Sequence, residues 1–123
     1  MPQYGRLPTM ARGSGRQSIL PGTLDLLILR TLVFGPRHGH GIAKHIRQTS
    51  EDVLQVEHGS LYPALQRLEQ AGWITSAWSA DARGRDMKFY RLTPAGRKQL
   101  TNEEARWRQV VRAMARMLRP ARG

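Results

Sequence analysis

The spacing of apolar residues in the first half of the chain predicts two helices joined by a short turn. Residues 23–34 are apolar around nearly the whole helical circumference, and Thr23 is the expected N-cap. A Gly-Pro pair at 35–36 ends this helix, and 37–41 are expected to form a turn. A second helix is expected over about 41–49, where two isoleucines lie four residues apart. Because the first helix is apolar on all sides, we expect its own core and a second subunit to cover it.

The middle of the chain predicts a short helix followed by two strands. The helix runs over about 60–70 with Ser60, or else Gly59, as its N-cap, and leucines at i, i+4 and i+7 form its buried stripe. Strands are expected over 73–79 and 87–92, joined by a basic tip at 81–86 that contains one glycine. A helix followed by a two-stranded ribbon with arginines at its tip is the layout of a winged helix-turn-helix.

The last predicted element is a long helix over 94–118, with Thr93 as its N-cap and a proline at its first position. At 1.5 Å per residue this helix is roughly 37 Å long, too long to be buried against so small a domain. Its apolar residues follow spacings of 7, 4, 3 and 4, as in a coiled-coil seam: Leu100, Trp107, Val111, Met114 and Leu118. We therefore expect the helix to pair with the same helix of an identical subunit.

Composition and charge narrow the range of partners. The chain has 123 residues, enough for one domain with a modest core, and a formal net charge of +11. Of its 20 lysines and arginines only three are lysines, so 17 are arginines, whose planar guanidinium suits phosphate and guanine edges. An excess of this size predicts a polyanionic partner, and the predicted elements favour DNA over an anionic membrane surface. The alternative explanation is a genome whose base composition favours arginine codons.

Several other functions find no support in the sequence. The absence of cysteine excludes disulfides, thiolate metal sites and cysteine nucleophiles. The four histidines lack the further ligands that a metal needs, so neither a metal nor a cofactor is expected. No nucleophile elbow or glycine-rich phosphate loop occurs, so the chain is not expected to be an enzyme. Without a bilayer-length apolar run or a secretory signal, a cytoplasmic location is expected.

The predicted DNA contacts lie on the second and third helices and on the ribbon. Gln66 and Arg67 are expected to reach into a groove, and Arg67 would either pair with guanine or hold phosphate. Ser60 offers a hydroxyl and a backbone N–H to phosphate. Tyr62 would contact phosphate or a thymine methyl, or else pack beside the ribbon. The complete set is Ser60, Tyr62, Pro63, Gln66, Arg67, Arg83, Arg85, Lys88 and Lys44.

Four segments resemble the PadR family of bacterial transcriptional regulators, in particular its compact subgroup with a single C-terminal helix. They are LPGTLDLLILRTL at 20–32, GHGI at 39–42, HGSLYPALQRLEQAGWI at 58–74 and KFYRLTPAGRKQL at 88–100. The resemblance implies a homodimeric winged-helix repressor in which the first and last helices build the dimer. It suggests a pore for a flat, apolar small effector at Trp107, with packing in the dimer seam as the other interpretation. The predicted interface residues are Leu24, Leu27, Ile28, Leu100, Trp107, Val111, Met114 and Leu118.

The sequence thus predicts a mainly α fold with a two-stranded β wing and a long C-terminal dimerisation helix. Its expected parts are a disordered basic tail over 1–18, a DNA-binding domain over 19–93, the dimerisation helix over 94–118 and a tail over 119–123. We expect a sequence-specific regulator, a homodimeric repressor whose recognition helices enter successive major grooves about 34 Å apart on an inverted repeat. The alternatives are an adaptor whose long helix docks on a larger protein, and an architectural DNA binder that ignores sequence. Membrane-surface binding is the weakest, because no helix opposes a basic face to a large aromatic one.

Overall fold

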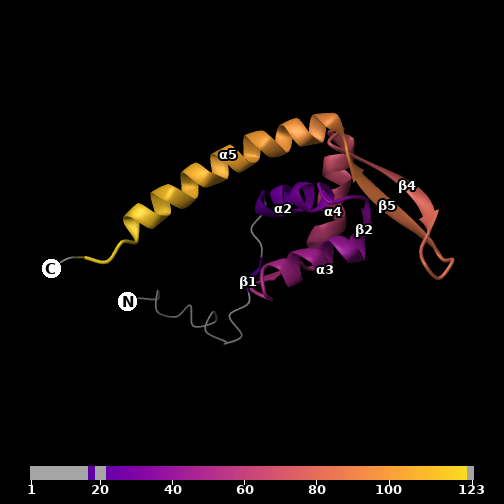
Figure 1. Ribbon diagram of the computed structural model, residues 1–123, viewed down its shortest axis with the longest axis horizontal. Coiled ribbons are helices and arrows are strands. Elements are labelled where there is room, and N and C mark those ends of the chain that lie inside the picture. The colour runs from indigo at the N-terminus through magenta and orange to yellow at the C-terminus, as the bar shows by residue number, and fades with distance from the viewer. Residues whose placement is uncertain (1–16, 19–21, 122–123) are drawn as a thin grey trace.

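Three short helices and a small sheet form the body of the protein, and a long helix leaves it (Figure 1). The computed structural model describes residues 17–18 and 22–121. Within them the helices of the body are α2 (Thr23–Leu32), α3 (Gly39–Thr49) and α4 (His58–Gln70). The long helix is α5 (Pro94–Met117), which starts beside the sheet and ends far from it (Figure 1).

The sheet has three antiparallel strands in the order β2-β5-β4. β4 (Ile74–Ala80) and β5 (Asp86–Leu92) pair along their whole length, and together with the turn between them they form the wing. β2 (Arg37–His38) pairs with the middle of β5, through Arg37 opposite Tyr90 and His38 opposite Phe89. The sequence pattern gave no indication of β2, because two residues are too few to show alternation.

The hydrophobic core lies where α2, α3, α4 and the base of the wing meet. Most of its members are leucines and isoleucines with few exposed atoms, joined by Ala64 and Tyr90, and Ile28, Ile42 and Leu61 are completely buried. α2 is buried along most of its length, as its apolar circumference predicts. The stripe of Leu61, Leu65 and Leu68 on α4 faces this core, as its helical spacing predicts.

Three of the residues predicted for the dimer interface belong to this core instead. Leu24 is 4% exposed, Ile28 0% and Leu100 5%, so none of them offers a surface to a partner. The prediction was wrong for these three, because an apolar residue on a helix that is covered on several sides cannot be assigned to one side from sequence alone. Leu27 is partly exposed, and the outer residues of α5 are largely exposed.

α2, α3 and α4 start one to two residues earlier than predicted, whereas α5 starts where it was predicted to. α3 begins at Gly39, where the Nδ1 atom of His38 accepts a hydrogen bond from the Gly41 N–H at 3.0 Å. α2 and α4 have Gly22 and Glu57 at their N-cap positions, and neither makes a side-chain cap. Thr23 and Ser60 therefore lie inside their helices, so both cap predictions were wrong. The prediction for α5 is confirmed, since Thr93 Oγ1 accepts from the Gly96 N–H at 2.9 Å.

Two residues of the predicted N-terminal tail belong to a strand. β1 (Gln17–Ser18) pairs in parallel with β3 (Leu54–Gln55), so its two residues have a defined place in the fold. Residues 1–16 of the predicted tail lie outside the described residues. With these adjustments the predicted fold class is confirmed: helices of a winged-helix domain with an antiparallel sheet.

Candidate nucleic-acid interface

The exposed side of α4 presents short polar and aromatic side chains between two flanks. Pro63 and Gln66 are exposed and lie in the middle of this side, one helical turn apart. Tyr62 lies on the flank toward the wing, and Arg67 lies on the flank toward α2. Pro63 is the sixth residue of α4 and lies beyond its first turn, so it removes the hydrogen bond that the Gly59 carbonyl would otherwise accept, contrary to the expected first-turn position. Four of the predicted contact residues thus occupy one side of one helix.

Tyr62 is held by a neighbouring stacked ring and by close packing at its hydroxyl end. Its ring stacks on His58, with ring centroids 6.5 Å apart and planes inclined by 7°. Its hydroxyl group lies directly over Gly39, where a Cβ atom would stand only 2.7 Å from Oη. The ring is nevertheless 48% exposed. Tyr62 therefore joins α4 to the start of α3 and still presents one side to an approaching ligand.

Arg67 is engaged within the chain. Its Nη2 atom lies 2.8 Å from Oδ1 of Asp25 in α2, across 42 residues of sequence. Both side chains remain partly exposed, at 55% and 27%. A groove contact by Arg67 would have to compete with this ion pair, which the sequence did not reveal because the partners lie in separate elements.

A hydrogen bond holds the base of the wing against α4. Ser76 Oγ donates a hydrogen bond of 2.6 Å to Oε2 of Glu69. Burial raises the pKa of the Tyr90 hydroxyl, and the Glu69 carboxylate and Tyr62 raise it further. Lys88 extends over the ring of Tyr90, with Nζ 5.8 Å from the centroid. The wing face that carries Ser76 and Lys88 is therefore continuous with the Tyr62 flank of α4, and we call the two together the α4–wing surface.

The wing tip is organised by one carboxylate. Oδ1 of Asp81 accepts hydrogen bonds from the backbone N–H groups of Arg83 and Arg85, at 2.8 and 2.9 Å. Its Oδ2 atom also accepts from Nε of Arg85 at 3.3 Å. Gly84 supplies the left-handed residue of the turn, with φ +81°. The hydrogen bond from the Arg85 N–H is the main reason that the pKa of Asp81 lies below its ordinary value.

The two arginines of the tip differ in freedom. Arg85 is tied to Asp81, whereas the Arg83 guanidinium has no hydrogen-bond or ion-pair partner in the described part of the chain. Lys44 is exposed on α3. The structure thus brings Tyr62 and Lys88 onto the α4–wing surface, leaves Arg67 on the other flank of α4, and places both arginines of the tip at the end of the wing.

Ser60 has less to offer than predicted. Its backbone N–H donates to the Glu57 carbonyl at 3.0 Å, because α4 begins two residues before Ser60. The prediction of a free Ser60 N–H was therefore wrong. Its side chain is exposed on the first turn.

The histidines serve structure. His38 caps α3, and its ring stacks on that of His40 at 6.3 Å and meets Phe89 edge-on at 5.5 Å. Burial, and then the charge of Arg37, lower the pKa of His45. Among residues 17–18 and 22–121 there is no group of three or more histidines and carboxylates suited to a metal ion. The same part of the chain has no helix long and apolar enough to cross a bilayer.

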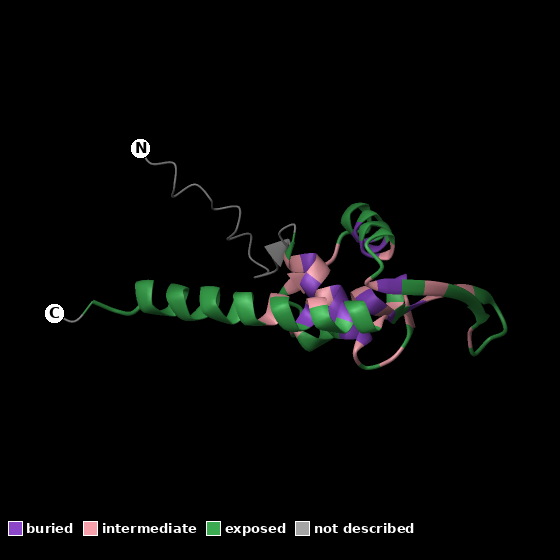
Figure 2. Cartoon of the chain, turned by 90° about the horizontal axis from the view of Figure 1, so that it is seen from above, coloured by how far each residue is buried: buried purple, intermediate pink, exposed green. Residues whose placement is uncertain are grey.

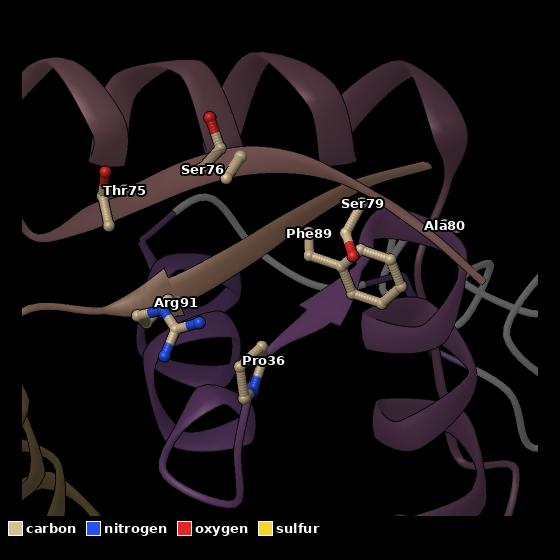
Figure 3. Close-up of a pocket in the computed structure, with 8 residues that line it drawn as sticks. Pro36, Thr75, Ser76, Ser79, Ala80, Phe89 and Arg91 are labelled. Atoms are coloured by element: carbon tan, nitrogen blue, oxygen red, sulfur yellow. The ribbon is translucent and has the colours of Figure 1, made fainter. Parts of the chain in front are cut away.

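A groove of about 520 Å³ lies on the face of the wing opposite to the α4–wing surface (Figure 3). Phe89, Arg91 and Pro36 line it together with hydroxyl groups of β4. Arg91 supplies its only charge among the described residues, so the groove presents one cation beside a mainly apolar floor. Most of its lining comes from the wing face that carries Thr75, Ala77, Ser79, Phe89 and Arg91, opposite to Trp78, and Ser76 and Ala80 border it.

The outer part of α5 is exposed (Figure 2), and several of its exposed residues are apolar. Trp107 is 45% exposed, Val111 47%, Met114 52% and Leu118 73%, and these four are the remaining predicted interface residues of the helix. At its inner end Trp107 also lines a groove of about 310 Å³ between α5 and the start of α2, with Leu26 and Val110. We call the exposed apolar residues Trp107, Val110, Val111, Met114, Met117 and Leu118 the α5 seam.

A helix on an antiparallel sheet with a basic hairpin beside it defines the class of winged-helix DNA-binding proteins. Within that class the model of the PadR-like family of transcriptional regulators matches residues 28–102, and the chain belongs to this family. The resemblance found in the sequence is thereby confirmed, and with it the class of DNA-binding transcriptional regulators, which are not enzymes.

Relatives and solved structures agree with this assignment. An uncharacterised protein of Lysinibacillus sphaericus is 30% identical over 95 residues, covering 77% of this chain and 87% of that protein. A transcriptional regulator of Mycobacterium tuberculosis is 36% identical over 66 residues, covering 54% and 61% of the two. A PadR family regulator from Clostridium difficile is 32% identical with a TM-score of 0.69, covering 79% of this chain and 99% of that one. For a PadR family regulator from Eggerthella lenta the identity is 25%, the TM-score 0.70 and the coverage 96% of each chain.

Proposed function

We propose that the protein is a homodimeric repressor that recognises an inverted-repeat operator through α4 and the wing. The observation that carries this proposal is the α4–wing surface, an exposed helix side that continues into a basic hairpin held in place by Ser76 and Glu69. A helix of this kind enters the major groove with its N-terminal half, and the hairpin then meets the neighbouring backbone.

Gln66 is the residue that we assign to base recognition. It is exposed in the middle of the free side of α4, and a glutamine amide pairs bidentately with the N6 and N7 edge of adenine. Ser60, Tyr62 and Pro63 would position the helix on the backbone, and Arg67 would join them only by leaving Asp25. Arg83, Arg85, Lys88 and Lys44 would contribute phosphate contacts, which give affinity without sequence preference.

The α5 seam supports the dimer. A monomer that exposes a row of tryptophan, valine, methionine and leucine on a protruding helix leaves apolar surface in water, and a second copy of the same helix covers it. Leu27, partly exposed on α2, lies in the helix that packs on α5 and would extend the interface. In this dimer the groove beside Trp107 would hold a small, flat, apolar effector.

Dimerisation is tested by placing a charge in the seam. Val111→Glu would bury a carboxylate between two helices, so we expect a monomer by sedimentation equilibrium at micromolar protein. Gln109→Glu is the matched control, because Gln109 lies off the seam on the same helix and should leave the dimer intact. A dimeric Val111→Glu protein would refute the assignment of the seam.

DNA recognition is tested by selecting operator fragments from genomic DNA and titrating them with excess unrelated duplex present. Gln66→Ala should weaken operator binding by about 1–3 kcal/mol and leave binding to unrelated duplex unchanged. Gln70→Ala is the control, since Gln70 is an exposed glutamine at the far end of the same helix and should bind as the wild type does. Equal binding of operator and unrelated duplex by the wild type would instead indicate an architectural DNA binder.

The direction of regulation needs a separate measurement. A reporter gene placed behind the selected operator should be transcribed less when the protein is present. It should recover in the Gln66→Ala variant. Increased transcription with the wild type would identify an activator and refute the repressor assignment.

A further inference from the structure

Trp78 is a large aromatic residue that the wing leaves in solvent. Its side chain lies on β4 and is 68% exposed, more than that of any other aromatic residue in the described part of the chain. Of the other exposed large apolar residues, six form the α5 seam, which leaves Phe34, Val53 and Tyr62. Phe34 is flanked by Arg30 and His45 within its own chain. Tyr62 belongs to the α4–wing surface, and Trp78 requires its own explanation.

The strand register places Trp78 on the α4–wing surface. Residues two apart in a strand share a face, so Trp78 lies on the same face as Ser76, whose hydroxyl binds Glu69 of α4. Its partner across the sheet is Lys88, and the next pair toward the body is Ser76 with Tyr90. Trp78 and Lys88 are therefore the first pair beyond the contact between wing and α4. In Figure 1 this part of the wing extends past α4, on the side opposite to the free end of α5.

The surroundings of Trp78 match a nucleic-acid backbone. Lys88 lies directly opposite, and Arg83 and Arg85 follow at the tip of the same hairpin. Phosphates are attracted by these cations, and the sugars between them present flat apolar surface that an indole ring covers. Tryptophan supplies such a rigid area at a low cost in side-chain entropy, and its indole N–H can donate to a phosphate oxygen.

We infer that Trp78 is a DNA-contacting residue of the wing, packed on backbone sugars beside the groove that α4 enters, with Lys88 on the adjacent phosphate. This inference rests on the proposed function, because it assumes that the duplex lies on the α4–wing surface. The contact is to the backbone, so it adds affinity equally for operator and unrelated sequence.

The first test compares Trp78→Ala with wild type by fluorescence anisotropy of labelled duplexes, using the selected operator and an unrelated sequence of equal length. We expect affinity to fall about tenfold on both duplexes, as for a truncated aromatic at an interface centre. Trp78→Phe should retain much of the affinity, and Ser79→Ala, on the opposite face of the same strand, all of it. The thermal midpoint should stay close to that of the wild type, because the lost side chain is exposed.

The second test uses Trp78 as its own reporter. In a Trp73→Phe, Trp107→Phe protein the remaining tryptophan is Trp78, and its emission should change as duplex is added, saturating together with the anisotropy. The inference is overturned if the emission stays unchanged while the anisotropy reports binding, or if Trp78→Ala binds with unchanged affinity. Either result leaves the proposed function standing. A wild-type protein that binds neither duplex overturns both.

Discussion

Replacing Gly96 by alanine should push the start of α5 away from the body of the protein and destabilise the fold. Gly96 is buried in the first turn of α5, and a Cβ atom added there would lie 2.0 Å from the Trp73 carbonyl oxygen and 2.9 Å from Cδ1 of Leu92. The clash with the carbonyl is with backbone, so rotation of a side chain cannot relieve it. The start of the helix must move outward by about 1 Å, which is within the range where overpacking costs about 1–3 kcal/mol or more.

Further contacts would be lost with this movement. The Thr93 N–H donates to the Trp73 carbonyl at 3.1 Å, and Thr93 Oγ1 donates to the Gly72 carbonyl at 2.7 Å. Each such hydrogen bond contributes about 1 kcal/mol net. Against these losses stands the higher helix propensity of alanine, about 1 kcal/mol. We therefore expect Gly96→Ala to lower the free energy of unfolding by about 3 kcal/mol.

The assay is urea unfolding monitored by circular dichroism. All samples have the same protein concentration, since association also contributes to apparent stability. Gly59→Ala is the matched control. Gly59 is likewise in the first turn of a helix, but a Cβ there meets nothing within 4 Å. This variant should be as stable as the wild type or slightly more stable. Neutral surface substitutions change the free energy of unfolding by up to about 0.5 kcal/mol. If Gly96→Ala differs from the wild type by no more than this, the close approach of α5 to Trp73 is refuted.

Three further predictions concern charged groups. Asp25→Asn should free Arg67 and lower stability by at most about 1 kcal/mol, the range of exposed ion pairs. The affinity for the operator should stay unchanged or increase, and weaker binding would contradict this expectation. Since burial and then Arg37 lower the pKa of His45, its neutral form is favoured in the folded state, so stability should fall as pH drops below about 6.5, its ordinary pKa. Unfolding of His45→Gln in urea at pH 7 and pH 5.5 should show a smaller loss than the wild type. Asp81→Asn should loosen the wing tip, because Asp81 accepts hydrogen bonds from two of its backbone N–H groups. Binding to all duplexes should weaken alike, and measuring the affinity of wild type and variant over a range of salt concentrations checks this.

The elements that the sequence predicted well have signals that lie close together in the chain. The leucine stripe of α4 repeats within one helix, and the Thr93-Pro94 start of α5 is read from adjacent residues. The fold class follows from the order of these local patterns. The exposed seam of α5 was predicted for the same reason, since its spacing needs no knowledge of the rest of the fold.

The features that sequence reasoning missed depend on residues far apart in the chain. The pair of Asp25 with Arg67, and the packing of Tyr62 over Gly39, join elements whose relative positions no local pattern specifies. Trp78 was passed over because alternation within β4 does not reveal which face meets α4. A usable signal was present, because Trp78 lies opposite Lys88 on an exposed part of the wing. A tryptophan is rarely placed in such a position for packing.

The contacts of α4 show how a change at the α5 seam would reach the DNA in the proposed dimer. Thr93 ties the start of α5 to the Gly72 and Trp73 carbonyls, immediately after α4 ends. α2 packs on both helices, with Asp25 paired to Arg67 of α4 and Arg30 lying 3.9 Å from Glu104 of α5. These exposed ion pairs contribute little, so the buried leucines and Ile28 of α2 must hold the two helices in fixed relation. Because α4 and α5 then move as one unit, a change in the angle at which two α5 helices cross would alter the separation of the two α4 helices without any bending inside a subunit.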